Sequence, residues 1–484
     1  MEKLKVALAG TFRPIFHGDM KSVLNHSIEV LEKKSNELKF DFVPVYKGME
    51  TLSDAQAVAK ELEEKKVDFV VIQNSSFADG DMILPFFSSS ARLAVWAVEE
   101  TTSSGPLPLN SFCATNLYVS IAGRYAPGYD RPVKWLFGDA ESPQFGRRFD
   151  TTIKALTAIK NLQGSRILQI GNTEFGYHDL KYDTGKLQKI FGVSVEKLEL
   201  DEFYNEYEAA MAKGDLDDRV SGIIKESNGV DAIEADVRKS AGAEVAFEKI
   251  VTKHRASAVS FRCWPEVPGK VGLMVCSTIG RLNQRKNGSG FEMVAATETD
   301  VLGAISMMAL RYLSGRETVL MDLSGWDQKA DSIYIWHCGN IPKSWFDKSG
   351  FRLANHFNRD KMGTVREGRM KPTEVTTLRF MENDASAFLA GGRFYERESP
   401  VYKGCSSWMN ELSINGQHTS SEDYMNTLLV NAVPHHLAYV DKDVATEVNE
   451  LCAWLGIGIM NPVSYQDYLQ RPRPIRSEIL NPNF

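Results

Sequence analysis

The chain has 484 residues, of which 43% are hydrophobic and 25% are charged, and this composition is typical of a globular protein. Its 56 Lys and Arg against 63 Asp and Glu give a net charge of −7, which argues against a nucleic-acid partner. No apolar run reaches the roughly 18 residues of a membrane span, and the first residues do not resemble a signal peptide, so we expect a cytoplasmic protein with no membrane partner.

Segments typical of strands and helices alternate through residues 1–162, as they do in a doubly wound parallel sheet. The pattern predicts strands at 4–10, 40–46, 67–73 and 93–98, and helices at 19–38 and 53–66. Ligands of such domains bind beyond the carboxyl ends of the strands. His17 and Gln73 lie at two of these ends, which makes them candidate substrate residues.

A second alternating region covers residues 163–342. Its predicted strands are at 165–171, 193–198, 258–263, 292–296, 318–322 and 333–337, with a strongly amphipathic helix at 301–313. From residue 343 onward, short alternating runs separated by turns favour a β-rich region. The predicted fold class is therefore α/β, with two doubly wound parallel-sheet domains (1–162 and 163–342) followed by a smaller β-rich C-terminal domain (343–484).

Several cofactor and catalytic motifs are absent from the sequence. The loop after the first strand, Gly10-Thr-Phe-Arg-Pro14, lacks the G-x-G-x-x-G pattern of a dinucleotide site, so a nicotinamide cofactor is not expected. There is no G-x-x-x-x-G-K-[ST] loop, no HExxH and no G-x-S-x-G elbow. The six cysteines are widely spaced and predict neither a disulfide framework nor a CxxC zinc site.

Three candidate metal ligands follow or end predicted strands in the central region. Glu298 follows one strand, and Asp322 and His337 end the next two. A strand–helix–strand crossover would bring Glu298 and Asp322 to the same edge of a parallel sheet. Carboxylates with an imidazole favour Mn²⁺ or a similar divalent ion over thiolate-preferring metals. Later in the chain, His435 and His436 supply further imidazoles.

Ordinary structural roles can also explain these residues. A carboxylate before a helix is often its N-cap, and Asp300 fits that role better than Glu298 because it lies at the start of the predicted helix. Asp322 could open a turn, and His337 could form a hydrogen-bonded core pair with Trp336. The combined spacing favours a metal site but does not decide the reaction.

The same residues lie in segments that resemble the L-fucose isomerase / L-arabinose isomerase superfamily. The resemblance is carried by Ala296-Thr-Glu-Thr-Asp-Val-Leu-Gly-Ala-Ile-Ser-Met-Met308, Leu320-Met-Asp322, Trp336-His-Cys-Gly-Asn340, Phe261-Arg-Cys-Trp-Pro-Glu266 and Pro434-His-His436. The spacing of Glu298 and Asp322, each in its local context, is the most specific part. The resemblance spans the central and C-terminal regions, and the N-terminal region agrees in organisation.

The resemblance implies an aldose–ketose isomerase with a Mn²⁺-type ion, built from three domains and assembled as a homo-oligomer, a trimer or a hexamer. The metal carboxylates of the family fall on Glu298 and Asp322. Its C-terminal histidine falls on His435 or His436, of which we prefer His436. His337 falls on a further histidine that only the arabinose isomerase branch uses, so the sequence lies between the two branches.

Sites of this superfamily often lie near a subunit interface. By that analogy, His17 and Gln73 would contribute to the site of a neighbouring subunit. The remaining candidates for substrate contact or for support of the ligands are His435, Glu266, Arg262, Trp264, Trp408 and Arg393.

The expected reaction converts an open-chain aldose into its 2-ketose through an enediolate, with a metal ion polarising the carbonyl. One of Glu298 and Asp322 would take the proton from C2, and the other would move protons between O1, O2 and C1. A neutral deoxy-aldose or pentose such as L-fucose or L-arabinose is the favoured substrate, and a cationic pocket would instead favour an anionic aldose such as sulfoquinovose. The same frame could also serve a non-catalytic sugar-binding protein, and the same metal site could serve an aldolase or an epimerase.

Overall fold

The computed structural model describes residues 3–126, 129, 131–173, 176–284, 293–358, 361–397 and 402–470 of the chain. The chain divides into two units, Met1–Asn161 with Asn449–Gly456, and Leu162–Val448 with Ile457–Phe484. The first unit therefore includes a short helical segment from late in the sequence, and each unit has its own sheets and cores.

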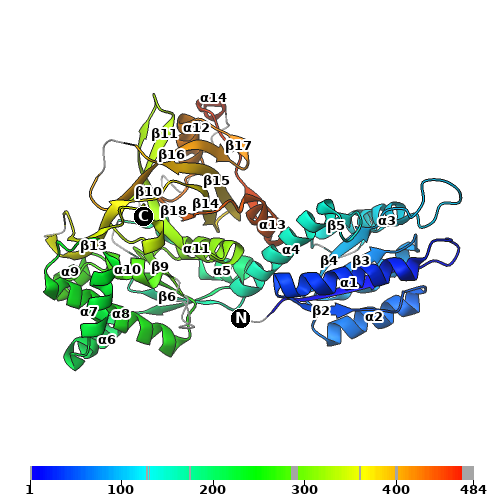
Figure 1. Ribbon diagram of the computed structural model, residues 1–484, viewed down its shortest axis with the longest axis horizontal. Helices are drawn as coiled ribbons and strands as arrows, with labels where there is room; N and C mark the ends of the chain where they lie inside the picture. Colours follow the sequence, from blue (N-terminus) through cyan, green and yellow to red (C-terminus); the bar gives the residue numbers. More distant parts are fainter. Residues whose placement is uncertain are drawn as a thin grey trace, which may run out of the picture. The chain divides into compact units, whose positions relative to one another are not determined.

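The first unit is built on a five-stranded parallel sheet with strand order β2-β1-β3-β4-β5 (Figure 1, blue to cyan). Its strands are β1 (Lys5–Gly10), β2 (Asp41–Pro44), β3 (Phe69–Asn74), β4 (Arg92–Ala97) and β5 (Val133–Phe137). Its helices are α1 (Met20–Leu38), α2 (Leu52–Glu64), η1 (Gly80–Ser88), α3 (Ser111–Arg124) and α4 (Pro143–Leu162).

Alternating side chains of these strands form a core on each face of the sheet. Val70, Ile72 and Val95 belong to the core that α2, η1 and α3 cover. On the opposite face, Trp96 stacks on Phe145 of α4 with ring centroids 4.2 Å apart. Helices on both faces explain why β1, β3 and β4 are apolar over most of their length.

The second unit contains a four-stranded parallel sheet with strand order β7-β6-β8-β9. Its strands are β6 (Arg166–Ile170), β7 (Ser194–Leu198), β8 (Ala258–Phe261) and β9 (Val294–Thr297). The helices of this region are η2 (His178–Leu180), α5 (Thr184–Phe191), α6 (Leu200–Lys213), α7 (Asp217–Glu226), α8 (Glu234–His254), α9 (Glu266–Val271) and α10 (Cys276–Leu282). On one face, the ring of Phe203 packs against those of Phe247 and Phe261.

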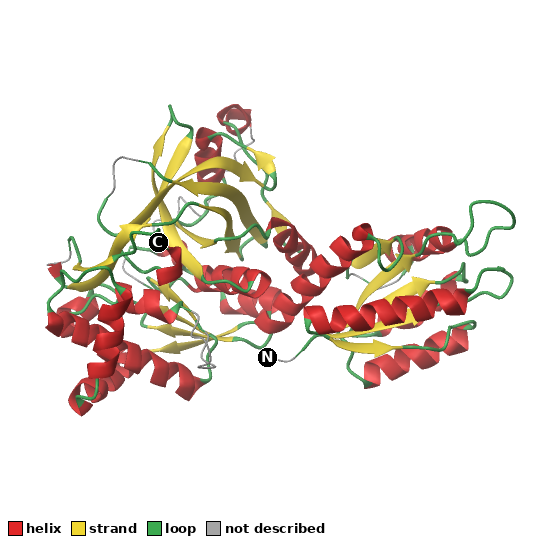
Figure 2. Cartoon of the chain, viewed as in Figure 1, coloured by secondary structure: helices red, strands yellow, loops and turns green. Residues whose placement is uncertain are grey.

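A closed antiparallel barrel of six strands completes the second unit (strands in yellow, Figure 2). The ring runs β16-β11-β10-β18-β14-β15, and β15 pairs with β16 to close it. These strands are β10 (Thr318–Asp327), β11 (Ser332–His337), β14 (Thr373–Met381), β15 (Ser386–Tyr395), β16 (Cys405–Ile414) and β18 (His436–Val440). The other elements are η3 (Lys343–Trp345), β12 (Arg352–Asn355), β13 (Gly363–Arg369), β17 (Gln417–His418), α12 (Ser421–Val430), α13 (Ala445–Leu455), β19 (Gly458–Ile459) and α14 (Tyr465–Gln470).

Strand β10 does not join the parallel sheet, so the crossover predicted for Glu298 and Asp322 is wrong. The strand pairs antiparallel with β11 on one side and with β18 on the other. The reason is the short connection 328–331, which turns β10 directly back into β11 as only an antiparallel pair allows. Asp322 therefore lies within a barrel strand, opposite His436 of β18. The barrel thus begins at residue 318, inside the range predicted for the central parallel domain.

Helix α11 (Val301–Ser314) lies between the parallel sheet and the barrel. It packs against β8 and β9 as well as against β10, β14 and β18, and almost all of its side chains are buried. The turn before α11 is therefore held close to barrel strands. Although α11 is apolar along its length, no helix in the described part of the chain is both long and apolar enough to cross a membrane.

Candidate active site

The turn between β9 and α11 carries Glu298 and Asp300. Backbone φ angles of 58° at Glu298 and 53° at Thr299 place both residues in the left-handed region, where a buried β-branched residue is strained. The Asp300 side chain caps α11 by accepting a hydrogen bond of 2.8 Å from the Gly303 amide. The capping role is therefore confirmed for Asp300, and the Glu298 carboxylate has a different environment.

Glu298, Asp322, His435 and His436 form what we call the acid–imidazole cluster. His436 Nε2 lies 3.5 Å from Glu298 Oε2 and 3.6 Å from Asp322 Oδ1. The pairing of Asp322 with His436 across β10 and β18 sets the second of these distances. His337, at the end of β11, brings a ring nitrogen within 4.8 Å of ligand atoms of Glu298 and His436.

Asp300 fixes the orientation of His436. Its Oδ2 lies 3.1 Å from His436 Nδ1, and His436 is 1% exposed. Burial opposes the charge on Asp300, but the buried guanidinium of Arg379 and the hydrogen bond with His436 hold the pKa of Asp300 well below its ordinary value. With Nδ1–H donated to this carboxylate, His436 keeps its lone pair on Nε2, which faces Glu298 and Asp322.

Asp179 of η2 holds His435. Its Oδ2 lies 2.6 Å from His435 Nδ1, while His435 Nε2 lies 3.6 Å from Glu298 Oε2. Burial opposes protonation of His435, yet hydrogen bonds to Asp179 and Glu298 raise its pKa to about 10. Burial likewise opposes the charge on Glu298, but the surrounding imidazoles lower its pKa to about 2. The ring of Tyr177 packs on His435 with centroids 5.3 Å apart.

The acid–imidazole cluster has the donor set of a divalent metal site. Asp322 Oδ1 is buried and has no hydrogen-bond partner among the described residues. Within the same residues, the ion pairs of Glu298 and Asp322 are to histidines, and none is to Lys or Arg. Two carboxylates with imidazole nitrogens suit a hard or borderline ion such as Mn²⁺. The residues present therefore fit the metal that the resemblance implies.

A pocket of ≈ 190 Å³ opens onto the cluster. Its described lining includes Glu298, Asp322, His337 and His435, but no Lys or Arg. Its aromatic wall is made of Tyr177, Trp264, Trp336 and Phe357. An apolar wall with a few convergent polar groups is typical of a small-molecule site.

Arg262 and Glu266, two predicted substrate residues, are paired with each other. Arg262 Nε lies 2.7 Å from Glu266 Oε2, and its guanidinium also donates to the backbone carbonyls of Asn172 and Thr173. Neither is part of the described pocket lining, whereas their neighbour Trp264 is.

Trp408 and Arg393 lie on the barrel, outside the described lining of this pocket. Trp408 of β16 packs against Tyr334, with ring centroids 5.0 Å apart. Arg393 of β15 is partly exposed, and its guanidinium lies 3.9 Å from Glu374. The structure therefore does not bring these two candidates to the acid–imidazole cluster.

His17 and Gln73 belong to the first unit. His17 is exposed in the loop between β1 and α1. Gln73 is fully buried, and its amide donates to Ser27 Oγ at 2.7 Å and accepts from Ser75 Oγ at 2.8 Å. Their contribution to a neighbouring subunit stays a prediction.

Several residues around the pocket carry no signal that sequence reasoning could use. Asp179 lies 256 positions from its partner His435. Asp300 is foreseen as a cap, but its contacts with His436 and Arg379 are not. Cys276 and Cys338, 62 positions apart, have their sulfur atoms 3.1 Å from each other at the same pocket. Only the folded chain brings these pairs together.

Comparisons with known proteins give a reaction class. A sulfoquinovose isomerase of Alkalicoccus urumqiensis is 26% identical over 438 residues, which cover 87% of this chain and 93% of the relative. A sulfoquinovose isomerase of Priestia aryabhattai is 27% identical over 84% of this chain and 88% of its own length. A sulfoquinovose isomerase of a Clostridium species is 28% identical over 64% of this chain and 68% of its own length. On these similarities the chain is an isomerase.

Two other matches do not bear on the reaction. The SseB protein N-terminal domain model matches residues 41–119 of this isomerase, a small part of the chain. An ABC transporter solute-binding protein from Burkholderia multivorans aligns over 66% of this chain and 95% of its own, with 12% identity and a TM-score of 0.17. So low a score carries no argument about the fold. The resemblance to fucose and arabinose isomerases stays a prediction.

Proposed function

We propose that this chain is a metal-dependent aldose–ketose isomerase. The observation that carries the proposal is the acid–imidazole cluster, where two carboxylates face an oriented imidazole and, in the described part of the chain, pair with no Lys or Arg. In the proposal Glu298, Asp322 and His436 hold the ion, His337 is a further ligand, and Mn²⁺ is the preferred metal. Similarity to the sulfoquinovose isomerases supports the reaction class.

When bound, a divalent ion supplies Lewis-acid polarisation of the sugar carbonyl, which acidifies the adjacent C–H group. Glu298 and Asp322 are the groups that move protons. One of them takes the proton from C2, and the other transfers protons among O1, O2 and C1. His435, held by Asp179 at the pocket wall, hydrogen-bonds a hydroxyl of the sugar. The aromatic wall limits water around the reacting carbons.

We propose an anionic aldose of the sulfoquinovose type as the substrate. The names of the relatives support it, and His435 of the described lining can carry positive charge. A neutral deoxy-aldose or pentose is the second candidate. The observations that favour it are the aromatic wall of the pocket and the absence of Lys and Arg from the described lining.

The proposed assembly rests on the resemblance alone, and the proposed location rests on the composition and on the N-terminal sequence. We propose a cytoplasmic homo-oligomer, a trimer or a hexamer, in which a neighbouring subunit contributes to each site. Light scattering coupled to gel filtration measures the assembly. A monomeric but active enzyme would contradict the shared site.

The experiment that tests the proposed function is an NMR assay in D₂O. Chelator-treated protein, with and without added Mn²⁺, is incubated with sulfoquinovose, L-fucose, L-arabinose, D-arabinose and L-rhamnose. We expect Mn²⁺-dependent formation of the 2-ketose from sulfoquinovose, with deuterium entering the product as proton transfer through solvent-exchanging carboxylates requires. Turnover of a neutral sugar alone would select the second candidate.

The matched control for this assay is the Glu298→Gln variant, which keeps the shape of the side chain and removes its charge. It should form ketose at least about 100-fold more slowly under the same conditions. If protein that is shown to bind Mn²⁺ forms no ketose from any of these sugars, the proposed substrates are wrong. Fragmentation of the sugar without ketose would indicate an aldolase instead.

A further inference from the structure

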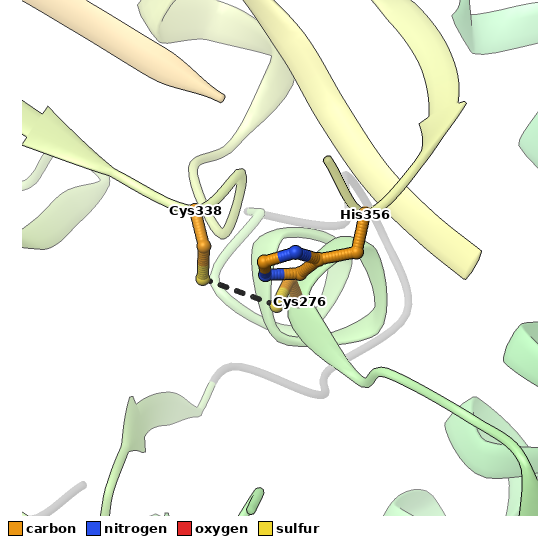
Figure 3. A group of neighbouring side chains, drawn as sticks. All are labelled: Cys276, Cys338 and His356. Atoms are coloured by element: carbon orange, nitrogen blue, oxygen red, sulfur yellow. Dashed lines mark hydrogen bonds between the residues drawn. The ribbon is translucent and has the colours of Figure 1, made fainter. Parts of the chain in front are cut away.

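A second group of potential metal ligands lies at the same pocket. It consists of Cys276, Cys338 and His356, which we call the thiol–imidazole cluster (Figure 3). Cys276 is the first residue of α10, Cys338 follows β11, and His356 follows β12. The two sulfur atoms are 3.1 Å apart, and all three ligand atoms lie within 4.8 Å of one another.

The surroundings of this cluster are mostly apolar. Cys276 is 1% exposed and His356 3% exposed. Met274, Ala354 and Val365 pack with Cys276 in a small hydrophobic core, and Cys338 packs against it. The two thiols and the imidazole of His356 are the potential ligands in this environment, and Cys338 Sγ also lies 3.1 Å from Nδ1 of its neighbour His337.

We propose that Cys276, Cys338 and His356 bind a thiophilic divalent cation of the Zn²⁺ class, at a site distinct from the acid–imidazole cluster. The donor sets of the two clusters are complementary. Thiolates select Zn²⁺ and similar soft or borderline ions, whereas carboxylates favour Mn²⁺ or Mg²⁺. One pocket wall thus offers two sites that different metals prefer.

The geometry requires only a small adjustment. Two sulfur atoms at about 2.3 Å from a tetrahedral Zn²⁺ lie about 3.8 Å apart. The present 3.1 Å therefore has to widen slightly, which side-chain rotation of Cys338 and Cys276 can supply. These two cysteines could also form a disulfide, but a disulfide would not involve the imidazole of His356. His356 is the residue that favours the metal over the disulfide.

His356 is held in the way that a metal-binding histidine usually is. Its Nδ1 lies 3.1 Å from the backbone carbonyl oxygen of Asn358 and 3.4 Å from the backbone amide nitrogen of the same residue. The carbonyl contact is the shorter of the two, and a proton donated from Nδ1 to this carbonyl leaves the lone pair on Nε2. Backbone carbonyls commonly orient metal-binding histidines in this way.

Three protein ligands leave the fourth position of a tetrahedral ion open. All three residues line the pocket that also contains Glu298 and Asp322, so the open position faces that pocket. Structural zinc sites have four protein ligands, whereas sites that bind water or a small molecule keep one position open. The proposed ion would therefore take water or a sugar hydroxyl as its fourth ligand.

Cobalt spectroscopy tests this site in the full-length protein. Reduced, chelator-treated protein is first saturated with Mn²⁺ and then titrated with Co²⁺. We expect one Co²⁺ per chain with a thiolate-to-cobalt charge-transfer band, which carboxylate–imidazole ligation does not produce, and we expect Zn²⁺ to abolish the band. Absence of the band in the wild-type protein would overturn the proposal.

Single substitutions locate the ligands. Cys276→Ser, Cys338→Ser and His356→Ala should each weaken Co²⁺ binding by more than about 100-fold, beyond the 10–100-fold typical of residues that only support a ligand. Cys263→Ser is the matched control, because Cys263 lines the same pocket outside the cluster. It should bind Co²⁺ as the wild type does.

Two outcomes would contradict the site, and one separates it from the proposed isomerase activity. An unchanged band in both Cys276→Ser and Cys338→Ser would assign the thiolate ligation elsewhere. A Cys276–Cys338 disulfide in the peptide map, with no Co²⁺ binding after its reduction, would replace the metal site by a redox pair. The Glu298→Gln variant should retain the band, so that loss of isomerase activity and loss of this site are distinguishable.

Discussion

Glu244 and Glu298 are both carboxylates of the second unit with little solvent exposure, 1% and 17% of the side chain, but their partners differ. Glu244 Oε2 lies 2.8 Å from Arg281 Nε, and its Oε1 lies 3.1 Å from Arg219 Nη1. Glu298 has histidines around it, and in the described part of the chain no arginine or lysine pairs with it.

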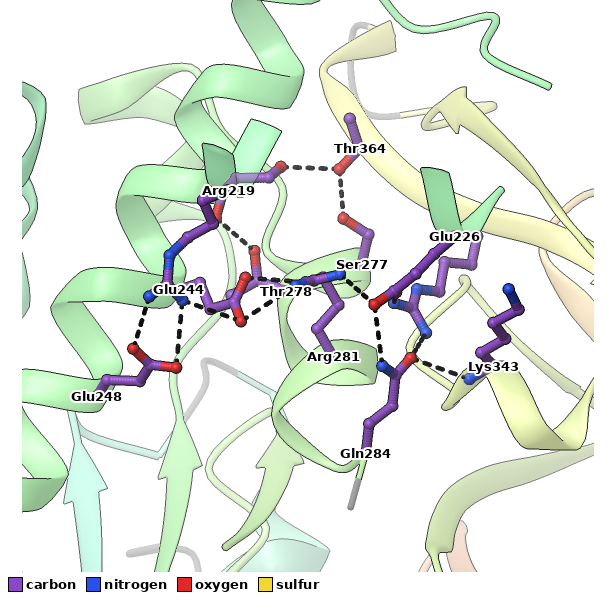
Figure 4. Close-up of polar contacts among 12 residues, drawn as sticks. Arg219, Glu226, Glu244, Glu248, Ser277, Thr278, Arg281, Gln284, Lys343 and Thr364 are labelled. Carbon is purple, nitrogen blue, oxygen red and sulfur yellow. Dashed lines mark hydrogen bonds and ion pairs between the residues drawn. The ribbon is translucent and has the colours of Figure 1, made fainter. Parts of the chain in front are cut away.

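Glu244 belongs to an ionic network in which acids and arginines alternate (Figure 4). Arg219 of α7 also binds Glu248, with 2.9 Å between Nη2 and Oε2. Glu226 lies 2.6 Å from Arg281 and 3.0 Å from Arg366 of β13. The network therefore joins α7, α8 and α10 to β13, and each of its carboxylates is paired.

The ionic network around Glu244 and the acid–imidazole cluster are two sets of buried charges with different roles. Matched charges satisfy one another and fix the relative positions of helices and strands. In the acid–imidazole cluster, Oδ1 of Asp322 has no hydrogen-bond partner among the described residues, and in the proposed function an added cation would complete it.

Removal of the Glu298 charge has the largest expected effect. Glu298→Gln should lower kcat for ketose formation by about 10²–10⁴-fold, because the variant loses both a proton-transfer group and a metal ligand. Steady-state assays at saturating Mn²⁺ measure kcat for the wild type and the variant. Glu374→Gln is the control, since Glu374 is 69% exposed on the barrel, and it should leave kcat unchanged. Wild-type kcat in Glu298→Gln would refute the assignment.

Glu244→Gln should affect stability instead of chemistry. Removing one partner of a buried ion pair leaves Arg219 and Arg281 incompletely matched, and the free energy of unfolding should fall by about 3–5 kcal/mol. Denaturant titrations of wild type and variant measure the loss. Activity per folded molecule should be retained. An unchanged free energy of unfolding would mean that the network does not stabilise the unit.

Asp300→Asn tests the orientation of His436. The amide can still cap α11, but it binds His436 Nδ1 less strongly than a carboxylate does. Mn²⁺ affinity should fall by about 10–100-fold. Calorimetric titration gives the Mn²⁺ affinity. An unfolding curve of the same sample shows how much stability is lost with the Asp300–Arg379 ion pair. Wild-type Mn²⁺ affinity would show that His436 is not a ligand.

Asp179→Asn should have the smallest effect and decides between the adjacent histidines. If His436 is the ligand, loss of the Asp179–His435 contact should leave Mn²⁺ affinity nearly unchanged and lower kcat by about tenfold or less, below the range of a direct acid–base group. A fall in Mn²⁺ affinity as large as that of Asp300→Asn would instead make His435 the ligand.

Periodicity in the sequence places many elements correctly, but it does not give their partners. The helix predicted at 301–313 is confirmed as α11, Val301–Ser314. The strand predicted at 318–322 exists, yet it pairs in the barrel, because the hairpin at 328–331 and not the preceding helix determines its neighbours. Strand pairing depends on such connections, and apolar patterning does not report them.

The candidate site shows the same limit. The sequence indicates Glu298, Asp322 and His436 because each has a recognisable context, and the structure brings these three side chains together. Asp179 could not be foreseen, since it lies in a short 3₁₀ turn with no motif around it. Arg262 is an expected substrate residue, but it pairs with Glu266 across the bend that leads into α9.

The most direct test of the central claim, that a divalent cation completes the acid–imidazole cluster, is a crystal structure of the protein grown with Mn²⁺. An anomalous difference map collected at the manganese edge locates the ion without assumptions about activity. We expect one strong peak bonded to Glu298, Asp322 and His436. A map with no peak at these residues, in protein that binds Mn²⁺ in solution, would contradict it.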